Sequence, residues 1–350
     1  MTRIELPSPP RRILIIKPSS LGDIVHTLPI LNLLRRQWPE SHISWLIGTA
    51  FAGLIEGHPQ LNEVIPFDRR LFARGWYSPT ALGGLIEFHR ELRRRQFDLV
   101  LDLQGLFRSG WLTYLTKAAV RVGFANAREL AHVFYTDRVP VDSMDQHAVD
   151  RYLGMAEALG CGKAPVEFNF VIRDQDRAHV DSLTEGLGRH ALLLPGTNWL
   201  TKRWPAEHFV KVIKPLQDRF NLGCVLAGST DAAGIAEQIM ASQPPGARMV
   251  NAVGRTSLTQ LVALIDRASL VIANDSGPMH IAAALNKPLI TLFGPTNPIR
   301  TGPYGRPETV LRVDIACSPC YSRRCSHTSC MKWISPEAVM DQAKASVKSE

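Results

Sequence analysis

The sequence lacks the segments that carry a chain into or across a membrane. None of its 350 residues lie in an uninterrupted apolar stretch of about 18 to 20 residues, the length that spans a bilayer. The opening segment, MTRIELPSPPRR, carries charges and prolines instead of the apolar run of a signal peptide. We therefore expect a cytoplasmic protein that does not span a membrane.

Three common motifs are also missing. The chain has no G-x-G-x-x-G after a strand, no G-x-x-x-x-G-K-[ST] and no G-x-S-x-G. These absences count against dehydrogenases of the dinucleotide-binding type, P-loop nucleotide hydrolases and α/β-hydrolases. There is no internal repeat or low-complexity tract either.

Negative charge is in the minority. Lys and Arg number 40 against 32 Asp and Glu, a net charge of +8, which favours anionic partners such as phosphorylated sugars, nucleotides or anionic lipids. The densest basic run, residues 90–95, lies in a helical pattern with few aromatics and is interpreted as a solvated helix face. We expect a monomer with no nucleic-acid partner.

Apolar runs alternate with helical patterns along the whole chain, as in parallel sheets built from crossover units. Residues 161–190 are richer in polar and turn-forming residues and separate two such series. We therefore predict two doubly wound α/β domains, residues 1–168 and 169–350, facing a cleft. A final helix from Pro336 is expected to pack back across the first domain. The predicted strands lie within residues 13–16, 42–48, 97–105, 190–196, 223–228, 269–275 and 288–294.

Ligands of open parallel sheets bind beyond the carboxyl ends of the strands, so the loops that leave strands are the candidate sites. The first such loop, KPSSLGD, places Asp23 at the start of a helix. A carboxylate there is often only a helix cap. Because Ser19 or Ser20 could cap instead, Asp23 could also act as a general base on an attacking hydroxyl. The residues alone leave both interpretations open.

Two loops of the second series have the composition of phosphate sites. ANDSGPMH, residues 273–280, leads into a helix of small residues whose first N–H groups and positive dipole end favour an anion such as a diphosphate. PGTNWLTKRWP, residues 195–205, offers hydroxyl and amide groups and the cation Lys202. The alternatives are a simple capped helix and a solvated lysine.

Four cysteines near the end of the chain, Cys317, Cys320, Cys325 and Cys330, form C-x2-C-x4-C-x4-C. This spacing resembles zinc or iron thiolate sites, although its gaps are shorter than in most zinc ribbons. The alternative is a loop of reduced thiols. We assign no cofactor and no catalytic metal, and leave a structural metal at this segment open.

Taken together, KPSSLGDIVHTLP, LDLQG, LPGTNWLTKRWP, NDSGPMHIAAAL and LFGPTNP resemble, in order, the bacterial heptosyltransferases of lipopolysaccharide core assembly. The resemblance covers nearly the whole chain and implies the GT-B fold, two Rossmann-like domains facing a central cleft. It also implies an inverting, metal-independent transferase that uses ADP-activated L-glycero-D-manno-heptose.

The resemblance assigns roles to individual residues. It implies that Asp23 is the catalytic base and that Lys202 binds phosphate. The remaining implied donor-binding residues are Thr197, Asn198, Asp275, Ser276, Gly277, Pro278, Met279 and His280. The implied acceptor-binding residues are Asp102, Gln104, Arg108 and Arg151.

The resemblance further implies that the acceptor is a phosphorylated lipid A/Kdo inner core at the membrane surface, reached by peripheral binding at the cytoplasmic face of the inner membrane. Two alternatives remain: a heptosyltransferase that modifies a protein such as an autotransporter, and a nucleotide-sugar-binding protein without catalysis.

Overall fold

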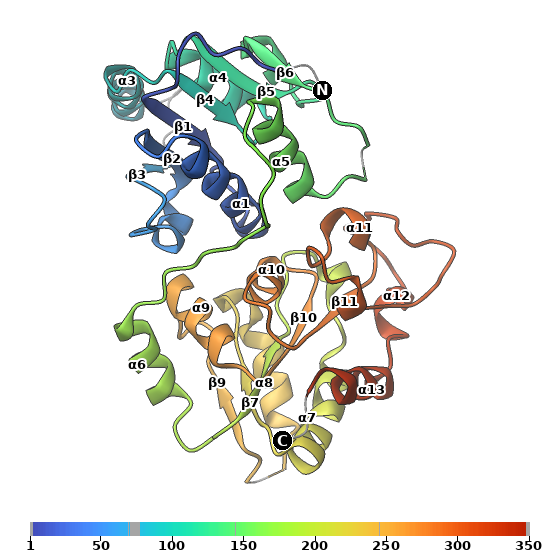
Figure 1. The fold of residues 1–350 in the computed structure, drawn as a ribbon. Helices are drawn as coiled ribbons and strands as arrows, with labels where there is room; N and C mark the ends of the chain where they lie inside the picture. Colours follow the sequence, from blue (N-terminus) through green and yellow to red (C-terminus); the bar gives the residue numbers. More distant parts are fainter. Residues whose placement is uncertain (1–2, 69, 71–77, 144, 245, 348–350) are drawn as a thin grey trace. The chain divides into compact units, whose positions relative to one another are not determined.

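The computed structural model describes residues 3–68, 70, 78–143, 145–244 and 246–347. The chain forms two compact units, Met1–Val171 and Ile172–Glu350. The boundary between them lies within residues 161–190, the segment that is rich in polar and turn-forming residues. Each unit is built around its own six-stranded sheet (Figure 1). No described helix is long and apolar enough to cross a bilayer.

In the first unit the strands run in the order β3-β2-β1-β4-β5-β6, and all neighbours are parallel. The strands are β1 (Arg12–Ile16), β2 (His42–Gly48), β3 (Glu63–Phe67), β4 (Leu99–Asp102), β5 (Val120–Phe124) and β6 (Asp137–Val139). The helices are α1 (Leu21–Gln37), α3 (Pro79–Arg94), α4 (Phe107–Leu115) and α5 (Ala148–Ala158), with short 3-10 helices η1 (Thr49–Leu54) and η2 (Ala131–Phe134).

The second unit repeats this strand order as β12-β11-β10-β7-β8-β9, again all parallel. Its strands are β7 (His190–Leu194), β8 (Gly223–Leu226), β9 (Met249–Asn251), β10 (Leu270–Asn274), β11 (Leu289–Phe293) and β12 (Val310–Arg312). Its helices are α6 (Asp174–Leu183), α7 (Ala206–Phe220), α8 (Ala233–Ala241), α9 (Leu258–Arg267), α10 (Gly277–Ala284), α11 (Pro298–Thr301), α12 (Ser329–Lys332) and α13 (Pro336–Ser346), with η3 (Leu200–Lys202), η4 (Thr230–Ala232) and η5 (Pro307–Thr309).

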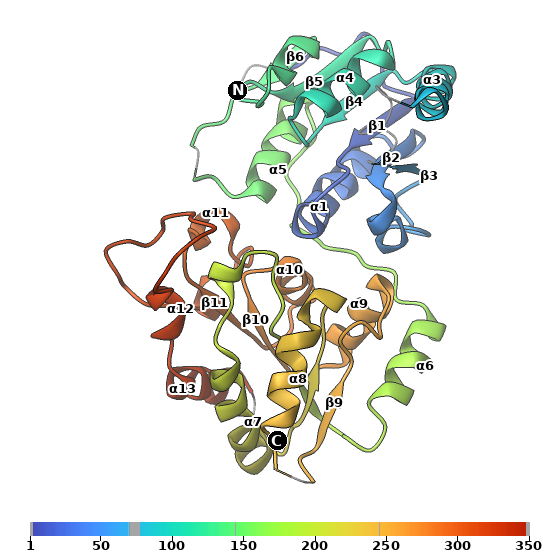
Figure 2. The ribbon, with the colours of Figure 1, turned by 180° about the vertical axis from the view of Figure 1, so that it is seen from behind.

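The central strands are continuous apolar runs because a parallel sheet is covered by helices on both faces. All residues of β7, β10 and β11 are buried, and so is β1 after its first residue. The fold prediction of two doubly wound parallel sheets is confirmed. Seen from behind, α7 and α8 lie side by side in the second unit (Figure 2).

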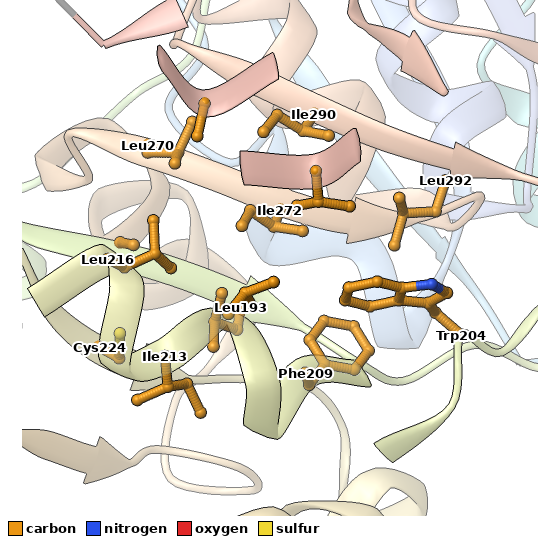
Figure 3. Close-up of a cluster of buried hydrophobic side chains, with 14 of the residues drawn as sticks. Leu193, Trp204, Phe209, Ile213, Leu216, Cys224, Leu270, Ile272, Ile290 and Leu292 are labelled. Atoms are coloured by element: carbon orange, nitrogen blue, oxygen red, sulfur yellow. The ribbon is translucent and has the colours of Figure 1, made fainter. Parts of the chain in front are cut away.

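The terminal helix packs within the second unit. α13 contributes Val339, Met340 and Ala343 to the core of that unit. Trp204 links these parts. Its indole packs edge-on against Phe209 (Figure 3), with ring centroids 4.8 Å apart. Its Nε1 donates to the carbonyl oxygen of Ile334. An amphipathic helix packs on the nearest uncovered apolar surface, which here is beside α7.

The basic run on α3 is engaged with carboxylates, as a solvated helix face would be. Arg94 pairs with Glu91 at 3.0 Å, and Arg95 pairs with Glu91 and Glu63, each at 2.8 Å. Arg93 and Arg94 are exposed. Exposed pairs of this kind contribute only about 0–1 kcal/mol each.

Candidate active site

The candidate loops of each unit flank the point where its strand order reverses. In the first sheet β1 lies beside β4, and in the second β7 lies beside β10. The loops after these strands carry Asp23, Gln104, Lys202 and Asp275. In doubly wound sheets this reversal opens a crevice at the carboxyl ends of the strands, where ligands bind.

Asp23 both caps α1 and faces a cation. It is the third residue of the helix, and its Oδ2 accepts hydrogen bonds from Ser20 N at 3.0 Å and Ser20 Oγ at 2.9 Å. Its Oδ1 lies 3.7 Å from Lys17 Nζ, and about a third of the side chain (35%) is exposed. The cap therefore uses one oxygen, and the other is oriented toward the charged neighbour.

Lys17 is a site residue that the sequence analysis missed. It follows β1, is only 4% exposed, and donates from Nζ to the carbonyl oxygen of Leu103 at 3.1 Å. Burial alone would lower the pKa of this ammonium, but Asp23 and Tyr152 outweigh burial, so the pKa is raised. Lys17 is consequently charged at neutral pH. The available signal was a lysine directly after a buried apolar strand.

Asp102 supports the loop that carries the predicted acceptor residues. Its side chain is fully buried; Oδ1 accepts from Gln104 N and Gly105 N at 2.9 and 3.1 Å, and Oδ2 accepts from Tyr135 OH at 2.7 Å. Burial raises the pKa of this carboxyl, while these hydrogen bonds oppose the shift. A carboxylate held in this way shapes the loop and is not exposed to a ligand.

The other predicted acceptor residues lie near this loop or on α5. Gln104 and Arg108 are half-buried on either side of the start of α4, and Arg151 is half-buried in the first turn of α5. Gln104 Oε1 and Arg151 Nε are buried atoms with no hydrogen-bond partner in the described part of the chain. Buried polar atoms are normally paired, so unpaired ones are candidates for ligand contacts.

In the second unit, Lys202 and Asp275 form a buried ion pair. Lys202 Nζ lies 2.6 Å from Asp275 Oδ2, with the side chains 14% and 5% exposed. Thr296 Oγ1 donates to the same carboxylate oxygen at 2.5 Å. The carboxylate therefore positions the ammonium at the carboxyl end of β10, an arrangement that sequence spacing did not reveal.

The loop before Lys202 is tied to the same place. Thr197 Oγ1 donates to the backbone oxygen of Asp275 at 3.3 Å, while Asn198 is exposed. The Trp199 ring lies 4.5 Å from Lys202 Nζ and 4.7 Å from the Arg323 guanidinium, measured to its centroid. Trp199 therefore brings a second cation, Arg323, to the same ring as Lys202.

The predicted diphosphate loop, residues 273–280, leads directly into α10, which begins inside it at Gly277. Ser276 is the N-cap residue, and Pro278 occupies the first turn, where a missing N–H costs nothing. Ser276 Oγ is buried without a hydrogen-bond partner among the residues described. Met279 is fully buried and His280 is 8% exposed, so their side chains belong mainly to the packing of α10.

The cysteine segment lies against the Lys202 loop. Thr201 Oγ1 donates to the carbonyl oxygen of Ser322 at 2.8 Å. Cys317, Cys320 and Cys325 are exposed and Cys330 is buried. Across residues 3–68, 70, 78–143, 145–244 and 246–347, no three or more His, Cys, Asp or Glu side chains are grouped so as to hold a metal ion.

We expect Cys325 to be the first thiol to react with iodoacetamide at neutral pH. Its Sγ accepts hydrogen bonds from the N–H groups of Thr328, at 3.4 Å, and His327, which lower its pKa. Burial raises the pKa of Cys161 and Cys224 to about 12, so these two should react only on unfolding. Peptide mass spectrometry over a pH series measures each thiol, with Cys325→Ser as the control. Equal labelling of Cys325 and Cys224 in the folded protein would contradict this assignment.

Comparison with known proteins finds one family. The profile of glycosyltransferase family 9 (heptosyltransferase) matches residues 85–331. Lipopolysaccharide heptosyltransferase 1 of Pseudomonas aeruginosa is 33% identical over 320 residues, which are 90% of this chain and 88% of that protein. A family 9 glycosyl transferase from Veillonella parvula superposes with a TM-score of 0.85 at 26% identity over 99% of both chains. E. coli heptosyltransferase WaaC with ADP-2-deoxy-2-fluoro heptose has a TM-score of 0.75 at 28% identity, covering 95% of this chain and 99% of that one.

Proposed function

This chain belongs to glycosyltransferase family 9, and from that membership we propose that it transfers heptose from ADP-L-glycero-D-manno-heptose to a hydroxyl of the Kdo/heptose inner core of lipopolysaccharide. Its two Rossmann-like sheets are those of GT-B heptosyltransferases. The reaction is an inverting displacement that needs no metal. The protein works as a monomer, at the cytoplasmic face of the inner membrane.

The observation that carries this proposal is the buried Lys202–Asp275 pair beside the N-terminus of α10. An ammonium held by a carboxylate, the first N–H groups of a helix and the unpartnered Ser276 hydroxyl together form a site for an anion. A sugar diphosphate places its phosphates there, with Thr197 and Asn198 on the preceding loop. The second unit, in the predicted range 169–350, is then the donor-binding domain.

The acceptor binds to the first unit, in the predicted range 1–168. The first unit presents an amide and two cations: Gln104 on the loop before α4, Arg108 in the first turn of α4 and Arg151 on α5. These groups suit the phosphates and carboxylates of a Kdo-containing core. Asp102 positions the loop before α4 by accepting hydrogen bonds from the N–H groups of Gln104 and Gly105. Asp23 is the carboxylate available to an attacking hydroxyl.

In the proposed reaction the acceptor oxygen attacks the anomeric carbon of heptose, and the bond from that carbon to the β-phosphate oxygen breaks. Asp23 takes the hydroxyl proton, and ADP leaves with an added negative charge. Lys202 and the α10 N-terminus stabilise that charge as it develops, and interactions that strengthen in the transition state accelerate the reaction. A single displacement inverts the anomeric configuration.

The proposal is tested by incubating the purified protein with ADP-heptose and a Kdo-bearing lipid A in the presence of excess EDTA. We expect ADP release together with a product heavier by one heptose, and its anomeric configuration reports inversion. Transfer only to a purified autotransporter would favour the protein-acceptor alternative. Absence of ADP release with either acceptor would favour the non-catalytic alternative.

A further inference from the structure

Large apolar side chains gather on the surface of the first unit, where η2 packs on α4. Phe107 is 51% exposed, Tyr114 38%, Leu130 65% and Val133 56%. These four residues, with Trp111 and Phe134, are named here the α4–η2 patch. Apolar side chains that cluster on a surface mark an interaction site more often than isolated ones do.

The aromatic rings of the α4–η2 patch pack against one another. Phe134 lies at its centre, with ring centroids 5.4 Å from Phe107, 5.8 Å from Trp111 and 6.0 Å from Tyr114. Gly110 permits this contact, because a Cβ at that position would lie 2.8 Å from the Phe134 ring and 2.9 Å from the carbonyl oxygen of Ala131.

The backbone just before η2 is strained at two residues, Glu129 and Leu130. Glu129 and Leu130 have φ values of 54° and 60°, in the left-handed region that a residue other than glycine seldom adopts. Such strain persists only where the surrounding structure holds it, and it is commonest at functional segments. Here its result is the exposure of a leucine on the surface.

Cations surround the α4–η2 patch. Lys117 Nζ lies 3.9 Å from the Tyr114 ring centroid. Arg121 donates from Nε to the carbonyl oxygen of Phe134, and Arg138 donates from Nε to that of His132, each at 3.1 Å. From residue 104 to residue 140 the sequence holds five cations, Arg108, Lys117, Arg121, Arg128 and Arg138, against two carboxylates, Glu129 and Asp137. Five cations and two carboxylates give this stretch a net charge of +3.

We propose that the α4–η2 patch is the surface through which this protein docks on an anionic lipid bilayer. Aromatic and aliphatic side chains with a rim of Lys and Arg suit the boundary between anionic headgroups and acyl chains. A protein partner, whose interface would also be rich in aromatics and arginine, is one of the outcomes that the test below distinguishes. The inference rests on the proposed function, because the patch begins beside Arg108, in the first turn of α4, which is assigned to a lipid-anchored acceptor.

The test is sedimentation with vesicles of equal parts phosphatidylglycerol and phosphatidylcholine, compared with vesicles of phosphatidylcholine alone. We expect the protein to bind the anionic vesicles and added salt to weaken binding. The combined variant Phe107→Ser, Leu130→Ser, Val133→Ser should lose about tenfold or more in vesicle affinity. Ile299→Ser, on an equally apolar and 72% exposed residue of the second unit, should leave binding unchanged.

Two further measurements separate the possible outcomes. Turnover on a deacylated, water-soluble acceptor should be unchanged in the triple serine variant, which shows that it is folded and that the loss concerns the bilayer only. Equal vesicle binding by the variant and the parent would overturn the proposal, as would a parent dimer that the variant dissociates. Failure of the proposed function would appear differently, as vesicle binding without transfer to any acceptor.

Discussion

Replacing Asp23 with alanine is expected to lower turnover by about a hundredfold or more while ADP still binds. The acceptor hydroxyl becomes acidic only as its bond to the anomeric carbon forms, and Asp23 is the carboxylate assigned to take that proton. Lys17, 3.7 Å from Asp23 Oδ1, holds a positive charge beside it. The measurement is the rate of ADP release at saturating donor and acceptor, with ADP affinity measured by calorimetry.

Because Asp23 also caps α1, the alanine variant removes a helix cap worth about 0.5–2 kcal/mol as well as the base. Asp23→Asn is the matched control, since an amide oxygen still accepts the Ser20 N–H bond but cannot take a proton. Ser20→Ala weakens the cap from its other side and retains the carboxylate. We expect Asp23→Asn to be as slow as Asp23→Ala, and Ser20→Ala to stay within a few fold of the parent. Near-normal turnover by Asp23→Asn would remove Asp23 from the role of base.

Replacing Lys202 with alanine should weaken both ADP and ADP-heptose by about ten- to a hundredfold, the range for loss of a charge-assisted hydrogen bond. In the proposed mechanism Lys202 contacts the phosphates before and during the reaction, so the affinity for both ligands falls in the variant. Turnover falls further because negative charge grows on the leaving group. Calorimetric titration with ADP in excess EDTA measures the affinity. Tight ADP binding by Lys202→Ala, or a requirement for a divalent ion, would refute the phosphate assignment.

The ion pair dictates the controls for this experiment. Removing Lys202 leaves the Asp275 carboxylate buried without its cation, which itself costs stability, so a thermal melt of each variant is needed. Asp275→Ala keeps the ammonium but removes the group that positions it, so it should weaken ADP less than Lys202→Ala does. It should weaken the sugar nucleotide more than ADP, because a carboxylate beside a diphosphate is better placed for sugar hydroxyls. Lys214→Ala breaks an exposed pair with Asp218, in which the lysine is 73% exposed, and should change neither affinity.

Sequence patterns predicted the central strands well, because a strand buried on both faces needs a continuous apolar run, as residues 13–16, 191–194 and 270–273 form in β1, β7 and β10. They did not predict β3, β5, β6, β9 or β12. The edge strands β3, β6, β9 and β12 are mostly half-buried or exposed, and the charged Arg121 interrupts the apolar run of β5. The packing of α13 beside α7 was not predicted, because its apolar residues do not specify which surface they cover.

The loops of the candidate site could be predicted from the sequence for a related reason. Strand ends are visible in the sequence, so Asp23, Lys202 and Asp275 could be selected as residues that follow strands. Their partners could not be selected. The contact of Lys202 with Asp275, and the position of Lys17 between Asp23 and the carbonyl oxygen of Leu103, depend on strands that are adjacent in space but distant in the chain. Residue roles assigned by resemblance remain predictions until the variants above are measured.

The identical strand order of the two sheets makes the chain a structural duplicate of itself, although its halves share no visible sequence repeat. Superposing β1 on β7 and β4 on β10 by topology brings Asp102 and Asn274, the last residues of β4 and β10, to equivalent positions. Both are fully buried, and both bind neighbouring loops, Asp102 through Gln104 and Tyr135 and Asn274 through Pro195 and Trp204. A polar strand end that anchors the loops beside it is therefore a requirement of this architecture that each half meets with a different side chain. This likeness between the two halves is visible in their strand order and not in their sequences.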